Sequence, residues 1–538
     1  MLNQDAKLEP TGVFDAVVVG AGFAGMYMLH RLRGMGFSVR VFEAGSGVGG
    51  TWYWNRYPGA RCDVESMQYS YQFSRELQQE WVWSERYAPQ PEILRYANHV
   101  ADRFGLRRDI QFDTRVHSAV FDEAENRWVL EFADRGRVAA TYCIMATGCL
   151  SSANTPKFVG IDSFRGETYH TGHWPHEGVD FSGKCVGVIG TGSSAIQSIP
   201  MIARQAAHLY VFQRTPNYTI PAHNGPLDPA YQAAVKADYP GLRARAKQTI
   251  PGLDFNYNME SALTVGEEKR QREFEARWAY GGLPFLGAFS DLLYDQAAND
   301  LAAEFVRRKI GEIVHDPKVA EMLSPRNVFG CKRLCVDTGY WETYNRPNVT
   351  LIDVSDEPIE AITPAGIRAK GQEYAVDAIV FATGFDAMTG ALLKIDIRGA
   401  GDQTLNEKWR EGPKTYLGLG IAGFPNLFTI TGPGSPSVLT NMLPSIEQHV
   451  EWLADCIGYL RDKGLSRIEP RAEAEESWVA HVREVAGISL RSTCSSWYIG
   501  ANVSGKPRVF MPYIGGFPAY VQKCDAVAAN GYEGFTLA

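Results

Sequence analysis

The sequence has little cysteine, no excess of basic charge and no long apolar run. Only nine of its 538 residues are cysteine and no Cys-x-x-Cys pair occurs, whereas zinc sites usually need two such clusters. Asp and Glu (61) outnumber Lys and Arg (53), so a nucleic-acid partner, which requires a basic face, is not expected. No apolar segment approaches the roughly 18 residues of a membrane span. We expect all the cysteines to be reduced thiols, mostly buried.

The remaining composition is that of an ordinary globular enzyme. Hydrophobic residues make up 45% of the chain and charged residues 21%, a typical balance for a folded protein. The opening segment, MLNQDAKLEP, lacks the basic and then apolar order of a secretory signal. The sequence therefore predicts a cytoplasmic enzyme with no membrane or nucleic-acid partner.

A first dinucleotide-binding pattern lies near the N-terminus. A β-branched strand is followed by Gly20, Gly22 and Gly25 at Gly-x-Gly-x-x-Gly spacing, with Phe23 in the same turn. The first glycine permits a tight turn, the second lets the backbone approach a pyrophosphate, and the third lets the helix pack close to the strand. A second strand ends in Glu43, an acid placed to accept hydrogen bonds from a ribose. This unit is predicted to bind FAD.

The pattern recurs later in the chain. A strand at Val186 to Ile189 is followed by Gly190, Gly192 and Ala195, and alanine is allowed at the third position. The next strand ends in Arg214 where the first unit ends in an acid. A cation at that point accommodates a 2′-phosphate, so the second unit is predicted to bind NADPH.

Both units close on an apolar run ending in Ala-Thr-Gly, within residues 143–150 and 378–386. The second unit is longer, and its extra residues are rich in Ala, Glu, Arg and Gln in helical patterns. The predicted fold is α/β, with two Rossmann-like dinucleotide-binding domains and a helical insertion in the second. The expected division is an FAD-binding domain at 1–150 and 387–538, an NADP-binding domain at 151–217 and 330–386, and an insertion at 218–329.

Three histidines at three-residue spacing, His170, His173 and His176, invite a metal-site interpretation. Gly172 and Pro175 disfavour a continuous helix through them. On a strand, residues three apart point to opposite faces. Neither geometry gathers three imidazoles around one ion, so no metal is expected.

The same stretch carries the fingerprint F-x-G-x-x-x-H-x-x-x-W-P. It resembles that of the type I Baeyer–Villiger monooxygenases, flavoenzymes that use NADPH and oxygen to convert ketones to esters or lactones. Segments such as GGTWYWNRYPGARCDVES, ATGFDAMTG and SWYIGAN extend the resemblance along the chain, and GPGSPSVL and YLGLG place it nearest the branch that holds phenylacetone and steroid monooxygenases. The fingerprint residues are Phe164, Gly166, His170, Trp174 and Pro175.

The resemblance implies a catalytic pair, Arg333 and Asp63, at the reactive edge of the flavin. Arg333 would stabilise a negatively charged peroxyflavin and its adduct with the ketone, because a permanently charged guanidinium favours a neighbouring anion. The acid would orient the arginine. Trp497 would lie on a mobile C-terminal loop over the nicotinamide; Ser504 stands there where the family usually has proline, which suggests a more flexible loop.

The resemblance also implies binding residues around each cofactor and the substrate. The residues expected to border FAD, besides the glycine turn and Glu43, are Gly50, Thr51, Trp52, Tyr69 and Met442. Those expected around NADPH, besides the second glycine turn, are Thr191, Ser193, Ser194, Gln197, Arg214, Thr215 and Lys332. Those expected to line the substrate pocket are Cys149, Pro436, Ser437, Val438 and Leu439.

Other functions compete with this interpretation. Flavin monooxygenases that oxygenate nitrogen or sulfur carry a similar fingerprint, with Tyr or Phe where Trp174-Pro175 stands here. A disulfide reductase needs a cysteine pair beside the flavin, and the closest pair, Cys331 and Cys335, falls in the other domain. A non-catalytic NADPH sensor would not need the FAD site. The favoured prediction is a monomeric enzyme acting on small ketones and O2, with sulfoxidation as a possible side activity.

Overall fold

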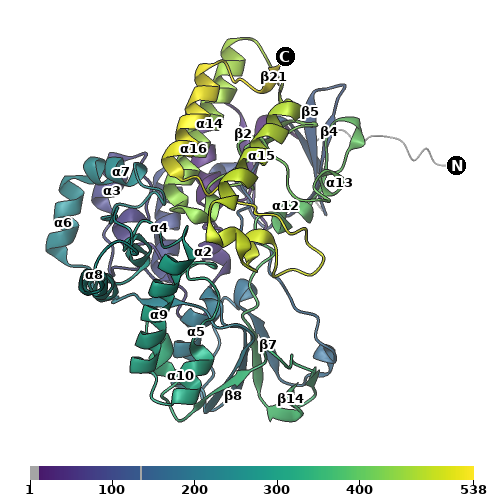
Figure 1. Ribbon diagram of the computed structural model, residues 1–538. Helices are drawn as coiled ribbons and strands as arrows, with labels where there is room; N and C mark the ends of the chain where they lie inside the picture. The colour runs from purple at the N-terminus through teal and green to yellow at the C-terminus, as the bar shows by residue number, and fades with distance from the viewer. Residues whose placement is uncertain (1–10, 134–135) are drawn as a thin grey trace.

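The computed structural model describes residues 11–133 and 136–538. The N-terminal segment considered above for a secretory signal, residues 1–10, lies outside this part. The chain forms two α/β units, each built on its own sheet and called here the upper and the lower layer, which lie one above the other (Figure 1). A group of helices flanks both layers on one side. Across the described residues, no helix is both long and apolar enough to cross a membrane.

The upper layer is built on a nine-stranded sheet. Strand β1 (Val13–Val19) is parallel to the strands on both sides of it, as expected for a buried dinucleotide-binding sheet. The strands in order are β17 (Asp396–Arg398), β4 (Val116–Asp122), β5 (Arg127–Phe132), β6 (Arg137–Met145), β1 (Val13–Val19), β2 (Val39–Phe42) and β3 (Ile110–Gln111), with β19 (Phe424–Thr429) on β6 and β18 (Gly420–Ile421) on β19.

Helices from both ends of the chain cover this sheet. The Tyr27 hydroxyl of α1 donates to Glu451 of α14 at 3.0 Å, joining two helices more than 400 residues apart in sequence. The helices in this layer are α1 (Phe23–Gly34), α2 (Thr51–Trp54), α3 (Arg75–Glu80), α4 (Gln90–Arg103), α12 (Gly390–Leu393), α13 (Leu405–Lys408), α14 (Met442–Asp462), α15 (Ala472–Gly487) and α16 (Phe517–Ala529). A short antiparallel pair, β20 (Ile468–Pro470) with β21 (Phe535–Leu537), lies at the C-terminus.

The lower layer is built on a five-stranded parallel sheet. Its strands in order are β12 (Val349–Asp353), β9 (His208–Gln213), β8 (Cys185–Ile189), β16 (Ala378–Phe381) and β7 (Glu167–His170). Helices α5 (Ser193–Gln205) and α11 (Tyr340–Thr343) accompany it, with a small antiparallel sheet of β13 (Ala361–Thr363), β14 (Gly366–Ala369) and β15 (Gln372–Ala375). The prediction of an α/β fold with two Rossmann-like units is confirmed.

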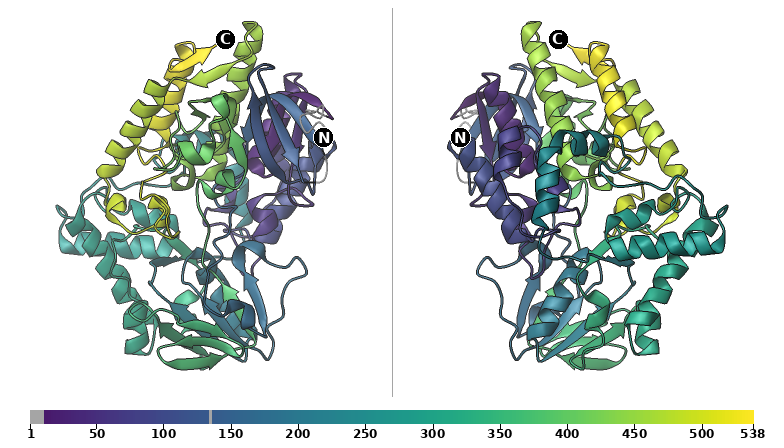
Figure 2. Two further views of the ribbon diagram at one scale, coloured as in Figure 1. Left: turned by 90° about the vertical axis from the view of Figure 1, so that its right-hand side faces the viewer. Right: turned by 90° about the vertical axis from the view of Figure 1, so that its left-hand side faces the viewer.

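Helices fill the segment between β9 and β12. Asp295 and Asp316 each cap a helix by accepting hydrogen bonds from two backbone N–H groups of the first turn, which explains where α9 and α10 begin. The elements of this segment are β10 (Thr219–Pro221), α6 (Pro229–Ala237), α7 (Tyr239–Lys247), α8 (Glu267–Tyr280), α9 (Gln296–Ile313), α10 (Pro317–Leu323) and β11 (Cys335–Asp337). In the side views of Figure 2 they lie alongside both layers.

Strand pairing bears on the proposed domain division. Strands β17 and β19, which follow residue 386, join the sheet that β1 begins, so the chain returns to its first layer. Strand β16 lies beside β8 in the second sheet, on the far side of the helical segment in sequence. These pairings support the division at 150, 217, 329 and 386 that we propose.

Candidate active site

Two equivalent glycine turns form the ends of the site. Gly20 has φ 105° and Gly190 has φ 114°, values that favour glycine. A Cβ on Gly20 would lie 2.6 Å from the carbonyl oxygen of Ala146, and one on Gly190 would lie 2.5 Å from that of Ala382. Each Ala-Thr-Gly run therefore lies directly against the glycine turn of its own sheet.

The helices that follow these turns fit phosphate groups. Helix α1 starts after Gly22 and α5 after Gly192, and at neither start does a side chain of the described residues cap the first N–H groups. Nothing lies within 4 Å of a Cβ placed on Gly192, and Ser193 beside it is exposed. Free N–H groups at a helix N-terminus, facing open space, are suited to bind a pyrophosphate.

Glu43 lies directly after β2, as the sequence predicts. Its Oε2 accepts from the Ala21 N–H and its Oε1 from the Gly45 N–H, both at 2.7 Å. Burial raises the pKa of Glu43, and these backbone donors oppose the rise by stabilising the carboxylate. The acid is held beside the first glycine turn, where a ribose hydroxyl can donate to its remaining lone pairs.

Gly50, one of the residues expected to border FAD, lies against the first glycine turn. Gly50 has φ 54°, and a Cβ placed on it would lie 2.8 Å from the Cα of Gly22, so the two loops are in contact. The indole N–H of Trp52 donates to the hydroxyl of buried Tyr69 at 3.1 Å. Thr51 at the start of α2 is exposed.

Two cations approach each other at the end of β9. Arg214, directly after the strand, is exposed. It lies close enough to Lys332 for its positive charge to disfavour the protonated form of that lysine. Burial, with the charge of Arg214, holds the pKa of Lys332 below its ordinary value. Within the described residues, neither side chain has an ion pair or hydrogen bond. Thr191 Oγ1 donates to the carbonyl of Thr215 at 2.8 Å, which sets this loop against the glycine turn. An unpaired cationic pair here fits a 2′-phosphate.

Arg333 and Asp63 form a bidentate pair between the two layers. Arg333 Nε donates to Oδ2 at 2.8 Å and Nη2 to Oδ1 at 3.0 Å, while Nη1 donates to the carbonyl of Val438 at 2.6 Å. Burial acts to lower the pKa of Arg333, but the adjacent carboxylate outweighs it and holds that pKa above its ordinary value. The guanidinium therefore stays charged and fixed in orientation.

An apolar cluster lies beside this pair. Burial raises the pKa of the Cys149 thiol to about 11, and Arg333 is near enough to oppose the rise. Ser437 Oγ donates to the carbonyl of Thr431 at 3.1 Å, and Pro436 before it is buried. The cluster consists of Cys149, Leu150, Ala387, Met388, Val438, Leu439, Met442, Trp497, Tyr498, Val509, Phe510 and Met511. Of the residues expected in the substrate pocket, Cys149, Val438 and Leu439 lie in this cluster, and Pro436 and Ser437 directly precede Val438 in sequence.

Tyr498 is a site residue that sequence reasoning missed. It is fully buried, and burial raises the pKa of its hydroxyl. Both Arg333 and Asp63 lie close enough to influence that pKa. Its ring packs against Trp497 with centroids 4.2 Å apart. The sequence signal that could have identified Tyr498 is its position inside SWYIGAN, directly after Trp497.

The C-terminal loop is joined to the second Ala-Thr-Gly segment. Lys506 Nζ contacts Asp386 Oδ1 at 2.6 Å and donates to the Ala387 carbonyl at 2.6 Å. The Asn502 side chain donates to the carbonyl of Phe385 at 2.7 Å. Ser504 lies exposed in a turn between these contacts. The loop that carries Trp497 is thus held in place by hydrogen bonds to residues 385–387.

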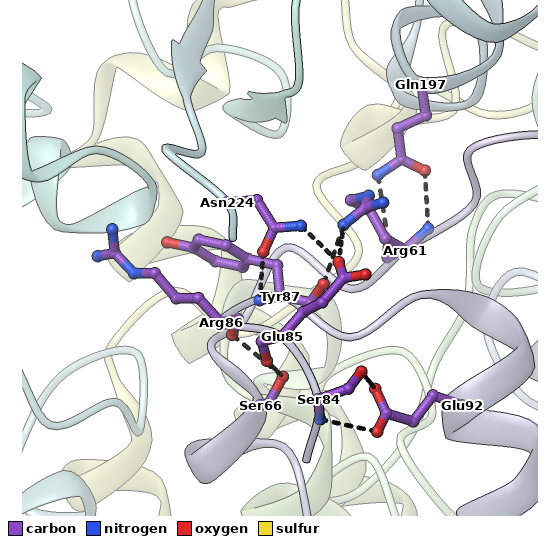
Figure 3. Close-up of polar contacts among 9 residues, drawn as sticks. All are labelled: Arg61, Ser66, Ser84, Glu85, Arg86, Tyr87, Glu92, Gln197 and Asn224. Atoms are coloured by element: carbon purple, nitrogen blue, oxygen red, sulfur yellow. Dashed lines mark hydrogen bonds and ion pairs between the residues drawn. The ribbon is translucent and has the colours of Figure 1, made fainter. Parts of the chain in front are cut away.

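Gln197 on α5 belongs to the seam between the layers. Its Oε1 accepts from the Tyr57 hydroxyl at 2.9 Å, and its Nε2 donates to the Arg61 carbonyl at 3.1 Å. Figure 3 shows this contact, in which Arg61 also reaches Glu85 at 2.9 Å while Asn224 of the helical segment reaches the same carboxylate at 2.6 Å. The amide expected near the NADPH phosphates is instead hydrogen-bonded to Tyr57 and to the Arg61 backbone.

Its neighbours on the helix are also engaged. Ser193 Oγ lies 3.1 Å from the Cys335 thiol. Ser194 lies close enough to the hydroxyl of half-buried Tyr57 to oppose the rise of its pKa that burial causes.

The three histidines point to different surroundings. His170 is buried, accepts from the Gly172 N–H at 2.9 Å and has Nε2 3.2 Å from Thr383 Oγ1. The His176 ring packs on Tyr53 at 4.9 Å, and the His173 ring lies 6.1 Å from that of His170. No group of three His, Cys, Asp or Glu suited to a metal occurs in residues 11–133 and 136–538.

The fingerprint shapes the crossing between the two layers. A Cβ on Gly166 would lie 2.3 Å from the Asp377 carbonyl, so β7 approaches the start of β16 closely. Trp174 is buried against Tyr169, with ring centroids 5.5 Å apart. Phe164 packs at the edge of the lower core. His170, the last residue of β7, lies 3.2 Å from Thr383 of the second Ala-Thr-Gly segment.

Comparison with known proteins identifies relatives along the whole chain. Residues 17–239 match the family described as pyridine nucleotide-disulphide oxidoreductase. The chain is 46% identical over 523 residues to a Baeyer-Villiger monooxygenase of Pseudooceanicola batsensis, covering 96% of this chain and 95% of that protein. It is 42% identical over 528 residues to phenazine N-monooxygenase PhzNO1 of Lysobacter antibioticus, covering 97% of each.

A solved structure is similar over nearly the same extent. Oxidized steroid monooxygenase bound to NADP superimposes with a TM-score of 0.93 at 55% sequence identity, covering 98% of this chain and 99% of that chain.

Proposed function

The chain belongs to the Baeyer–Villiger monooxygenases, and from that premise we propose that Arg333 and Asp63 form its oxygenation centre. The protein is an FAD- and NADPH-dependent enzyme that converts ketones to esters or lactones. In this reaction O2 would be the source of the inserted oxygen atom.

One observation supports the proposal above all others. The Arg333 guanidinium donates two hydrogen bonds to the Asp63 carboxylate and one to the Val438 carbonyl, at the wall of an apolar cluster. When bound, the flavin supplies the oxygen chemistry. Arg333 provides a fixed positive charge where negative charge develops on oxygen, and such preorganised charge is usually the largest single catalytic contribution.

The surrounding residues have distinct proposed roles. The first glycine turn, Glu43 and the Trp52–Tyr69 pair would hold FAD, and the second glycine turn with Arg214 and Lys332 would hold NADPH. The cluster around Cys149 and Val438 would receive the ketone and exclude water. Trp497 and Tyr498 would cover it from the C-terminal loop.

A labelled-oxygen experiment tests the reaction. Purified protein with NADPH is given aryl, cyclic and bulky ketones under isotopically labelled O2, and the products are analysed by mass spectrometry. The expected products are esters or lactones carrying one labelled oxygen atom. Consumption of NADPH without any labelled product from the whole panel would contradict the proposal.

Nitrogen oxygenation is a second candidate activity. The observation in its favour is the 42% identity to a protein named phenazine N-monooxygenase, which carries a different reaction on a chain of this kind. Trp174-Pro175 at the fingerprint favours ketone chemistry. Turnover of aromatic amines or N-heterocycles in the same panel, with ketones inert, would favour this alternative; sulfide turnover beside ketones would fit the main proposal.

We further propose that the enzyme is a monomer in the cytoplasm. The support for a monomer is the family resemblance, and the support for the cytoplasm is the composition of an ordinary globular enzyme. Light scattering of the purified protein measures its mass directly.

A further inference from the structure

Cys331, two residues before Arg333, lies close to Cys494 from a distant part of the sequence. Cys331 precedes Lys332 and Arg333, and Cys494 lies shortly before Trp497 on the C-terminal loop. Both are buried and free, and each thiol lies close enough to the other to influence it. The two segments are also joined independently, because Arg491 Nε donates to the Gly330 carbonyl at 2.9 Å.

The surroundings of Cys331 favour its thiolate. The neighbouring Cys494 thiol contributes most to lowering the pKa of Cys331; burial opposes this, while Asn327, Lys332 and Arg491 act in the same direction as Cys494. Cys494 lies 3.3 Å from the Leu490 carbonyl oxygen and its own pKa is raised, chiefly by the Cys331 thiol. The pair therefore has the asymmetry of an attacking thiolate with a resolving thiol beside it.

We propose that Cys331 and Cys494 form a reversible disulfide when the protein meets a peroxide. The Cys331 sulfur attacks one oxygen of hydrogen peroxide, so an S–O bond forms, the O–O bond breaks, and hydroxide leaves as water after taking a proton. The Cys494 sulfur then attacks the sulfenic sulfur, so the S–S bond forms and a second water leaves with the Cys494 proton. Two thiols lose two electrons and the peroxide is reduced to two waters.

The enzyme's own chemistry provides a source of this oxidant. An NADPH-consuming monooxygenase that passes two electrons to O2 without a substrate to oxygenate releases NADP+ and hydrogen peroxide. That source depends on the proposed function, whereas the disulfide itself requires only peroxide. Bond formation brings the two sulfurs to about 2.05 Å.

The disulfide would tether the C-terminal loop to the segment that carries Arg333. The loop between 496 and 511 is otherwise held by polar contacts such as Lys506 with Asp386. A covalent bond at its base restricts opening, so exchange of the nicotinamide cofactor slows and turnover falls. Peroxide formed by NADPH consumption without a ketone would then slow further NADPH consumption by the same enzyme.

The test exposes purified holoenzyme to hydrogen peroxide without NADPH. Remaining thiols are alkylated, peptides are mapped by mass spectrometry, and NADPH oxidation with a ketone is measured before and after dithiothreitol. We expect a peptide pair joined through Cys331 and Cys494, with loss of activity that dithiothreitol restores. Cys494→Ser should resist the loss, and the half-buried control Cys185→Ser should behave as the unmodified protein.

Three results would overturn the inference. They are the absence of the joined peptides after oxidation, loss of activity that persists in Cys494→Ser, and formation of the disulfide with activity and cofactor release unchanged. Mapping in the unmodified protein needs no variant, so a poorly folded Cys494→Ser leaves the question decidable. A disulfide that forms in a protein unable to oxygenate any ketone would count against the proposed function alone.

Discussion

The guanidinium of Arg333 and the carboxylate of Asp63 meet through two parallel hydrogen bonds, although 270 positions separate them in sequence. The pair joins a loop of the first layer to the segment just before β11. Its third contact, with the Val438 carbonyl, brings in the C-terminal part of the chain. Three separate regions therefore determine where one positive charge lies.

Replacing Arg333 should separate flavin reduction from oxygenation. In Arg333→Ala both glycine turns remain, so the protein should stay yellow, bind NADPH and reduce its flavin. Ester formation should fall by about 10²–10³, because a preorganised stabiliser of negative oxygen is lost. Stopped-flow absorbance of flavin reduction, beside product yield from a reactive ketone, measures both.

The conservative and control variants sharpen this test. Arg333→Lys keeps the charge without the planar fork, so it should recover only part of the activity. Arg326→Ala removes an exposed arginine and should change neither step. If Arg333→Ala makes ester at a near-normal rate, the arginine is only a cofactor contact.

Asp63→Asn should impair the same step less severely. The amide keeps the shape but not the charge, so the guanidinium loses its ionic partner and retains the Val438 carbonyl. Loss of about 1.5 kcal/mol of positioning corresponds to roughly tenfold in oxygenation rate. The ratio of ester formed to NADPH consumed should fall while NADPH affinity holds; unchanged coupling would refute the positioning role.

Arg214→Ala should mainly raise KM for NADPH. Loss of a charge-assisted contact with a 2′-phosphate costs about 1.5–3 kcal/mol, or roughly 10- to 150-fold. Steady-state kinetics with NADPH and NADH should show the preference narrowing, because NADH lacks that phosphate. Arg204→Ala, on the exposed face of α5, is the matched control, and equal kcat/KM for both coenzymes in the unmodified enzyme would refute the assignment.

Lys506→Ala should loosen the C-terminal loop. The lysine side chain is 10% exposed and its contact with Asp386 ties the loop to the second Ala-Thr-Gly segment. Limited proteolysis within 496–511 should become faster, and more NADPH should be consumed per ester formed. Lys523→Ala, at an exposed position of α16, should leave cleavage unchanged. Identical cleavage of the two variants would show that the ion pair does not hold the loop.

Acid should destabilise the protein partly through His449. This buried imidazole accepts from the Thr431 N–H at Nδ1 and faces the Tyr520 hydroxyl at Nε2, both at 2.9 Å, so the neutral form fits. Burial lowers its pKa to about 3. Because the unfolded chain binds this proton near pH 6.5, the unfolded state holds more protons in between, and stability falls as pH drops from about 6.5 toward 3, by up to about 1.4 kcal/mol per pH unit.

A pair of variants isolates that contribution. His449→Gln should lower the apparent Tm at pH 8 and flatten its decline between pH 7 and pH 5. The exposed control His315→Gln should leave the decline as it is. If His449→Gln and the unmodified protein lose Tm in parallel on acidification, the histidine does not carry the effect.

The sequence by itself determined the two nucleotide-binding units and hence the fold class. Glycines at fixed spacing after a strand impose a turn whatever the rest of the chain does, because φ near 105° or 114° favours glycine. The residue that ends the next strand, Glu43 or Arg214, is likewise tied to its turn by short local spacing. Such rules act within about 25 residues, so they can be seen without a structure.

Tertiary structure alone decided how distant segments meet. No local spacing relates Cys331 to Cys494, places Tyr498 beside Arg333, or turns Gln197 toward the Arg61 backbone. Those positions depend on how two layers and a helical segment pack, and packing is settled by the burial of many side chains together rather than by any short pattern. Sequence resemblance pointed to Arg333 and Asp63 as partners, but the distances and angles between them exist only in the folded chain.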